Sequence, residues 1–225
     1  MIFKKAIYND YIYKNPMAGY KLSVGKPTKK KHTMPEEQML YLFDYIFSNP
    51  SVMSLAVDML ARYGMSRSEL LGIQRSSVDL DNLVIHVVQS VTVQDHAVEA
   101  GNTKNKYRTR DVAISRMTAD LIRELEPELS ENYLISYTDS PMHPETFSRR
   151  YKKFMNDFIE YFAKKDIKID YIRIHEMRHT RASLWVSEDK SLFAIANQMG
   201  WANLDMLKKR YGHVNVDTVR TLLDI

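Results

Sequence analysis

Apolar residues along most of the chain recur every three or four positions, the spacing of helices with one buried face. Met39, Leu42, Phe43 and Ile46 mark the first long helix. Asn49-Pro50 then breaks the pattern, because proline cannot continue a regular helix. The predicted helices span residues 33–48, 52–63, 68–73, 118–126, 144–164, 176–186, 190–199, 203–210 and 214–225.

Several helix ends carry local signals. Thr33 and Glu36 have the spacing of a capping box, in which a hydroxyl and a carboxylate each bind a free backbone N–H. Pro35 suits the first turn of a helix. Ser51 is a good cap for the next helix, and Gly64 is a typical terminator. These signals predict helices that begin near Thr33 and Ser51.

The pattern changes in the middle of the chain. A turn at Asp81-Asn82 precedes the run LVIHVVQSVTV, whose β-branched residues favour strands. Gly101-Asn102 predicts a second turn, and residues 112–114 complete the set. The predicted fold is therefore mainly α with a small three-stranded antiparallel β-sheet.

Charge is concentrated at the N-terminus. Residues 1–32 hold eight lysines and one acidic residue, so this segment carries +7 while the other 193 residues carry −3. A basic arm suits a polyanionic partner such as nucleic acid, although a solvated tail has the same composition.

Other features exclude several protein classes. The 225 residues include no cysteine, which rules out disulfides, thiol catalysis and cysteine-bound zinc. No apolar run reaches the ~20 residues that span a bilayer, and the N-terminus lacks an apolar signal core. We therefore expect a protein with no membrane association, located in the cytoplasm.

One short segment supports two chemical interpretations. His175-Glu176-x-x-His179 matches a zinc protease pattern, with Glu188 as a conceivable third ligand. The downstream glycine and third histidine of the extended pattern are absent. Alternatively, His175 and Arg178 share a helix face and converge on one phosphate. A purely structural role, with Arg178 buried against a carboxylate, is also consistent with the segment.

Together with the residues that follow it, this segment resembles the phage-integrase type of tyrosine recombinase. The family pattern His-x-x-Arg, then Leu-Gly-His/Trp, then tyrosine is matched by His175-x-x-Arg178, Met199-Gly200-Trp201 and Tyr211. Upstream, residues 63–71 resemble the family's first arginine box and residues 103–114 its lysine-bearing β-hairpin. The resemblance implies the tyrosine recombinase catalytic-domain fold.

The resemblance also implies a mechanism without metal or other cofactor. Tyr211 attacks a scissile phosphate and forms a 3′-phosphotyrosyl link, while Arg178 stabilises the developing charge. His175 and Trp201 assist at the phosphate, and Lys104 protonates the leaving 5′ oxygen. Whether Lys104 or Lys106 is that acid stays open, because the two share one strand face. Glu69 occupies the family's supporting acidic position.

DNA contacts are expected outside the catalytic set. A basic cluster near the start of the helix at 144–164 is typical of a phosphate-binding face, although a solvated helix face has the same pattern. The predicted DNA-contacting residues are Lys29, Lys30, Lys31, Arg67, Lys106, Arg108, Arg110, Ser148, Arg149, Arg150, Lys152, Lys153 and Arg181.

By the same resemblance, the chain divides into three parts. Residues 1–32 are interpreted as the remnant of a core-binding domain with a basic interdomain linker, residues 33–213 as the catalytic domain, and residues 214–225 as a tail helix that docks on a neighbouring protomer. This division predicts a piece of a longer integrase. The expected partners are double-stranded DNA with specific recombination sites and further copies of the chain, dimer to tetramer on DNA. The expected source is bacterial or phage-encoded, with a nucleoid-associated location.

One position departs from the family. The residue after Gly64-Met65, where the family has its first catalytic arginine, is Ser66, and Arg67 comes one residue later. If the segment is helical there, that shift turns the side chain by ~100°. We therefore expect a site-specific recombinase with impaired cleavage, or alternatively a catalytically inactive DNA-binding protein on the same scaffold. A type IB topoisomerase-like relaxation activity would use the same chemistry.

Overall fold

The computed structural model describes residues 2–19, 32–94, 97–102 and 109–201. The chain divides into two compact units, residues 1–31 and 32–225. In the described part of the first unit, α1 spans Ile2–Tyr8, buries none of its residues and is followed by turns.

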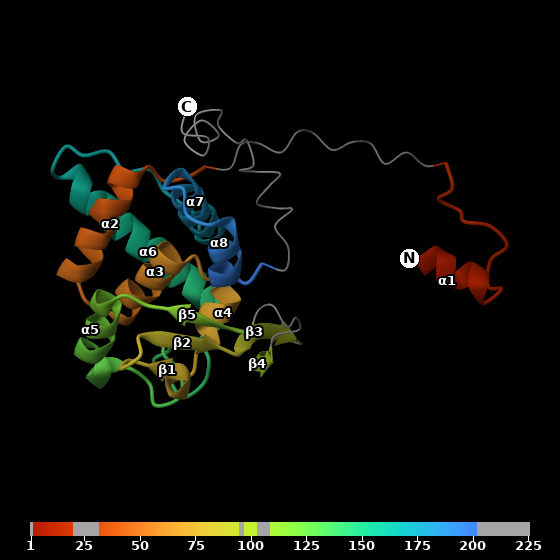
Figure 1. Ribbon diagram of the computed structural model, residues 1–225, viewed down its shortest axis with the longest axis horizontal. Helices are drawn as coiled ribbons and strands as arrows, with labels where there is room; N and C mark the ends of the chain where they lie inside the picture. Colours follow the sequence, from red (N-terminus) through yellow and green to blue (C-terminus); the bar gives the residue numbers. More distant parts are fainter. Residues whose placement is uncertain (1, 20–31, 95–96, 103–108, 202–225) are drawn as a thin grey trace, which may run out of the picture. The chain divides into compact units, whose positions relative to one another are not determined.

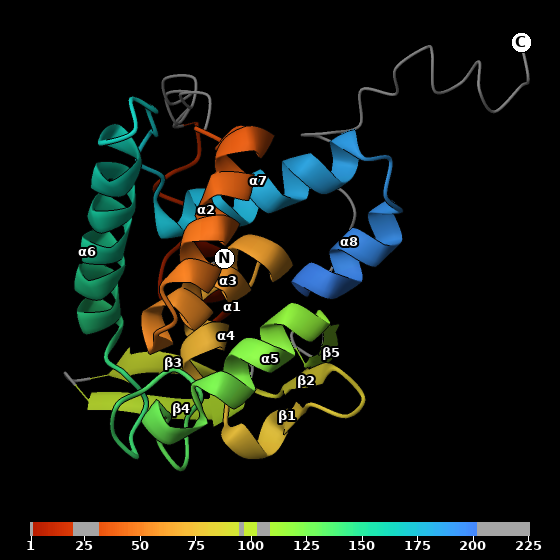
Figure 2. The same cartoon turned by 90° about the vertical axis from the view of Figure 1, so that its left-hand side faces the viewer.

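The described part of the second unit is mainly helical, and its strands lie at one end of the helical bundle (Figures 1 and 2). The fold class predicted from the sequence is therefore confirmed. Its α-helices are α2 (Glu36–Ser48), α3 (Val52–Tyr63), α4 (Arg67–Leu71), α5 (Arg116–Glu124), α6 (Pro144–Ala163), α7 (Ile174–Ser187) and α8 (Leu192–Met199). Two short 3₁₀ helices are η1 (Arg75–Ser77) and η3 (Glu126–Glu128).

The helix α3 forms the centre of this unit and packs against α2, α4, α5, α6 and α7. Every α3 residue except Arg62 is buried. Its ends follow the sequence signals: the Ser51 side chain accepts from the Ser54 N–H, and Gly64 ends the helix with φ +62°. A fully buried helix must also satisfy its polar residues, and Asp58 accepts hydrogen bonds from Arg62 and Thr118.

The start of α2 differs from the prediction. Pro35 is the N-cap residue, with no side-chain cap, and Thr33 is exposed. The reason lies in the preceding residue, because Met34 is buried and its N–H donates to Thr180 Oγ1 at 3.1 Å. This attachment to α7 draws the chain into an extended path, so the capping box predicted from Thr33 and Glu36 is wrong.

The strands form two antiparallel groups rather than one. Within the described residues, a three-stranded sheet has the order β1 (Val78–Asp79), β2 (Val84–Val87), β5 (Arg110–Ala113), and a separate hairpin pairs β3 (Gln89–Gln94) with β4 (Ala97–Asn102). The apolar run read as strand from the sequence therefore divides at Val88. The hairpin packs on α4, next to the candidate site.

The last two predicted helices, at 203–210 and 214–225, lie outside the described residues. No described helix combines the length and the apolar character needed to cross a membrane.

Candidate active site

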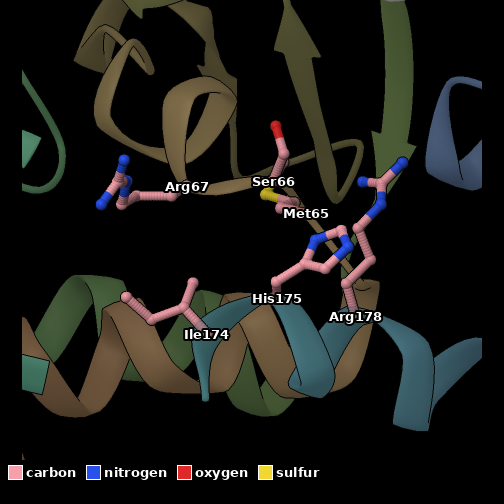
Figure 3. A pocket seen from close by; sticks show the side chains of 6 residues that line it. All are labelled: Met65, Ser66, Arg67, Ile174, His175 and Arg178. Carbon is pink, nitrogen blue, oxygen red and sulfur yellow. The ribbon is translucent and has the colours of Figure 1, made fainter. Parts of the chain in front are cut away.

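A pocket of about 320 Å³ lies between the start of α4 and the start of α7. Figure 3 shows the two groups of side chains that face each other across it. It brings together Ser66, His175 and Arg178 from the predicted catalytic set and Arg67 from the predicted DNA contacts. The lining residues are Met65, Ser66, Arg67, Ile174, His175 and Arg178.

Arg178 is held in place by backbone oxygens from two other segments. Its side chain is buried, its Nη1 donates to the Gly64 carbonyl at 2.6 Å, and its Nη2 donates to the Met199 carbonyl. The Trp201 ring lies 5.3 Å from the guanidinium carbon. Because both carbonyls belong to helix ends, where backbone oxygens have no helical partner, the guanidinium also completes the caps of α3 and α8.

His175 sits at the exposed edge of the same pocket, one helical turn from His179. The Nε2 atoms of the two rings lie 3.0 Å apart, and the rings are nearly perpendicular at 85°. Contact at this distance requires one nitrogen to donate and the other to accept. His179, which is buried, therefore orients His175 toward a defined position.

The zinc protease pattern folds differently from a metal site. Glu176 accepts from the Arg173 N–H at 3.0 Å and so caps the start of α7. Across the described ranges, His, Cys, Asp and Glu side chains form no group of three or more suited to a metal ion.

Glu69 contacts residues from both sides of the pocket, Arg178 on α7 and Ser66 at the start of α4. Its buried carboxylate lies 3.3 Å from Arg110 Nη2 and 3.6 Å from Arg178 Nη1. Burial alone would raise the pKa of this carboxyl, but the charges of Arg110 and Arg178 and the Ser66 N–H outweigh burial and lower it. Glu69 is therefore a carboxylate shared by two guanidinium groups.

Ser66 and Arg67 form the opposite wall. Ser66 has extended backbone and is the N-cap of α4, and it forms a capping box with Glu69. Arg67 Nη1 donates to Ser148 Oγ at 2.8 Å, at the start of α6. Figure 3 shows the Arg67 side chain extending away from Arg178, with Ser66 between them. Although Ser66 is not helical, the displaced arginine still points elsewhere.

Two residues predicted to contact DNA are buried instead. Arg110 donates from Nε to the Gln198 carbonyl at 2.9 Å. Arg181 donates from Nε to the Ala61 carbonyl at 2.7 Å, and burial lowers its pKa. Both guanidinium groups bind backbone oxygens inside the fold, so neither has the exposure that the prediction required.

The basic cluster near the start of α6 is exposed. Arg149, Arg150, Lys152 and Lys153 are all accessible, and the Arg150 guanidinium lies 4.4 Å from the Tyr137 ring centre. Lys153 pairs with Asp157 at 2.7 Å. Ser148 binds both Arg67 and the Pro144 carbonyl, so it positions Arg67 within this surface.

Several predicted residues lie outside the described residues. They are Tyr211, Lys104, Lys106, Arg108, Lys29, Lys30 and Lys31, together with the tail at 214–225. Their roles stay predictions.

The sequence analysis missed the parts of the site that act through the backbone and through His179. The carbonyls of Gly64 and Met199 carry no side-chain signal. His179 appeared only as a ligand in the zinc pattern, although its spacing four residues after His175 already indicated contact between the rings.

Comparison with known proteins agrees with this geometry. Residues 32–217 match the phage integrase family. The chain is 24% identical over 235 residues to the ICEBs1 integrase of Bacillus subtilis (strain 168), covering 99% of this chain and 61% of that protein. It is 26% identical over 211 residues to an integrase of Staphylococcus phage L54a, covering 83% of this chain and 56% of that protein. The chain thus spans about three fifths of the length of these relatives.

Solved structures show the same fold. The Tn1549 transposon integrase in complex with transposon right end DNA superposes with a TM-score of 0.77 at 20% identity, covering 99% of this chain and 74% of that one. A lambda integrase tetramer bound to a Holliday junction gives a TM-score of 0.57 at 19% identity, covering 92% of this chain and 55% of that one. With the match over residues 32–217, these findings confirm the resemblance read from the sequence: the chain belongs to the phage integrase family of tyrosine recombinases.

Proposed function

We propose that the chain is a site-specific DNA recombinase that cleaves and rejoins DNA through a 3′-phosphotyrosyl intermediate. The observation that carries this proposal is the pocket in which the fixed guanidinium of Arg178 and the exposed imidazole of His175 converge. A phosphodiester needs such donors in fixed positions, because negative charge builds up on its oxygens during displacement. Arg178 suits this task because its planar fork binds phosphate oxygens and stays charged.

The proposed reaction exchanges one phosphodiester for another. The Tyr211 oxygen forms a bond to phosphorus while the bond to the 5′ oxygen breaks. The phenol proton passes to His175, and the leaving 5′ oxygen takes a proton from Lys104. Trp201 donates its indole N–H to a phosphate oxygen. Since the covalent product has similar energy, rejoining is the same sequence in reverse.

Serine at position 66 lowers the expected rate of DNA cleavage. Ser66 stands where the family places its first arginine, and Arg67 is bound to Ser148. Removing one fixed donor from an oxyanion site typically reduces the rate by ~10²–10³-fold. We therefore propose a recombinase with impaired cleavage. The second candidate, a DNA-binding protein without strand-cleaving activity, is favoured by the same observation.

The partners follow from this activity. We propose that the exposed basic face of α6 and Lys29–Lys31 bind the phosphate backbone of double-stranded DNA, and that the tail at 214–225 joins protomers on DNA. A lambda integrase has been solved as a tetramer on a Holliday junction, which supports assembly on DNA. The proposed location is the bacterial cytoplasm, at the nucleoid.

The test uses the full chain and its Ser66→Arg and Tyr211→Phe variants. Each is incubated with duplex oligonucleotides that carry a randomised core and a nick, and protein–DNA adducts that resist detergent are quantified and sequenced. We expect a weak adduct with the parent, an adduct formed ~10²–10³-fold faster with Ser66→Arg, and none with Tyr211→Phe.

Two outcomes decide between the candidates. Enrichment of specific sequences by binding, with no adduct from either the parent or Ser66→Arg, would favour the inactive DNA-binding protein. An adduct that persists in Tyr211→Phe would contradict Tyr211 as the nucleophile.

A further inference from the structure

Arg110 lies near the pocket but is not one of its lining residues. Its side chain is only 3% exposed at the first residue of β5. From there it reaches two elements: Nη2 donates to Glu69 Oε2 at 3.3 Å, and Nε donates to the Gln198 carbonyl at 2.9 Å. Arg110 therefore ties β5 to α4 and to the end of α8.

Arg110 packs closely against the backbone of Gly200, where a side chain would collide with it. A Cβ on Gly200 would lie 2.7 Å from Arg110 Nη1 and 3.0 Å from Cζ. Gly200 also has φ +64°, which residues with a side chain rarely adopt. The guanidinium is thus held between a glycine backbone on one side and the Glu69 carboxylate on another.

The charges in this cluster do not cancel. Glu69 carries one negative charge and lies beside two guanidinium groups, Arg110 at 3.3 Å and Arg178 at 3.6 Å. The three groups together carry a net +1. If Arg110 were neutral, the charge of Glu69 would cancel that of Arg178, and the cluster would carry no net charge.

The positions of the two arginines show which one faces the pocket. Arg178 lines it, whereas Arg110 lies behind it against Gly200. An anion in the pocket is therefore closest to Arg178, which attracts it, and is repelled by the nearby carboxylate of Glu69. At these separations in a partly buried site, one unit charge changes anion binding substantially.

We propose that Arg110 is a positioning residue that neutralises Glu69, so that the positive charge of Arg178 stays available to an anion in the pocket. The proposal rests on the proposed function only in identifying that anion as a DNA phosphodiester. It explains why a buried carboxylate is compatible with an anion site: Glu69 caps α4 and anchors Arg178, and Arg110 offsets the electrostatic cost.

This role differs measurably from simple packing. A packing role predicts that damage adds up when both partners are changed. A charge role predicts rescue: Arg110→Met leaves a net charge of zero, Glu69→Gln leaves +2, and the double variant returns to the parental +1. Arg110→Lys keeps the charge while losing the planar fork, and serves as the matched control.

The experiment measures inorganic sulfate binding in the pocket without any DNA. The ring signals of His175, assigned by their loss in His175→Gln, report sulfate titrations by NMR. We expect Arg110→Met to weaken sulfate binding about tenfold. The double variant Arg110→Met/Glu69→Gln and Arg110→Lys should both bind within about threefold of the parent, and Glu69→Gln at least as tightly.

The proposal is overturned if the double variant binds sulfate as weakly as Arg110→Met, or if Arg110→Met binds like the parent. Should Arg110→Met fail to fold, the double variant is compared with the parent, which carries the same net charge, and sulfate binding weaker than the parent's by more than about threefold would contradict the proposal. The adduct assay in the Ser66→Arg background is separate. Absence of adduct there, with sulfate rescue intact, would refute the proposed function and leave the role of Arg110 standing.

Discussion

Arg178 and Arg67 both line the pocket, yet their surroundings are opposite. Arg178 is buried, binds the carbonyls of Gly64 and Met199, and lies beside a buried carboxylate. Arg67 is exposed and bound to Ser148 on α6. An arginine fixed by several buried acceptors keeps one position before any ligand arrives, whereas an exposed arginine bound through a surface hydroxyl does not. The comparison teaches that the number of cations near the pocket matters less than how each is held.

The largest expected effect follows from removing the fixed arginine. Arg178→Ala leaves the carbonyls of Gly64 and Met199 without this donor and Glu69 with one guanidinium fewer. Breaking a buried charged pair in this way typically destabilises a protein by about 3–5 kcal/mol. Urea unfolding measures the change. Arg67→Ala is the matched control and should cost no more than about 1 kcal/mol, because exposed polar contacts contribute little. Equal losses in the two variants would contradict the comparison.

The second prediction concerns the opposite wall. Ser66→Arg should raise the rate of adduct formation by ~10²–10³-fold, because it adds a donor at the family's arginine position. It should also lower stability by about 0.5–2 kcal/mol, since Ser66 caps α4. Ser66→Ala is the control, because it removes the cap without adding a cation. A similar gain in Ser66→Ala would show that loosening α4, rather than the new guanidinium, is responsible.

The sequence predicted the fold best where a local signal marks an element end. Ser51 and Gly64 bound α3 as expected, and the capping box of Ser66 with Glu69 at the start of α4 is a signal of the same local kind. These signals depend on neighbours within a few residues, so one sequence suffices to read them. The start of α2 was misjudged because the buried contact of Met34 with Thr180, 146 residues away, overrides the local cap.

The family pattern selected three residues that line one pocket, His175, Arg178 and Ser66, but it did not identify the groups that hold them there. Arg110 and Arg181 were misassigned because their charge alone does not tell a surface arginine from one that binds carbonyls inside the fold. The acceptors are backbone atoms of Gln198 and Ala61, which carry no side-chain signal. Only tertiary structure identifies them.

The third prediction tests how tightly the backbone of Gly200 holds Arg110. Gly200→Ala should destabilise the protein by about 1–3 kcal/mol, because it combines a positive φ with a Cβ pressed against Arg110. Gly101→Ala in β4 is the control, since a Cβ there meets nothing within 4 Å. Thermal unfolding compares the two. If Gly200→Ala is as stable as Gly101→Ala, Arg110 can shift at little cost, and the close contact with Gly200 does not hold it in place.

The smallest effect compares two buried carboxyls with opposite pKa shifts. The pKa of Glu69 lies below its ordinary value of 4.5, because the charges of Arg110 and Arg178 outweigh burial. The pKa of Asp58 lies above its ordinary value of 3.8, because burial outweighs Arg62 and the Thr118 hydroxyl. The first group serves the pocket, and the second serves the packing of α3. The two should therefore respond to pH in opposite directions.

The sign follows from proton binding in the folded and unfolded states. The contribution of Glu69 is present above pH 4.5 and is lost as the pH falls through its lowered folded pKa. That of Asp58 is present below pH 3.8 and is lost as the pH rises through its raised folded pKa. Urea unfolding from about pH 3 to 7 should thus show the stability of the parent relative to Glu69→Gln rising with pH, and relative to Asp58→Asn falling. If the stability of the parent relative to Glu69→Gln does not rise with pH, the arginines do not outweigh burial at Glu69, and the electrostatic contrast between the pocket and the core fails.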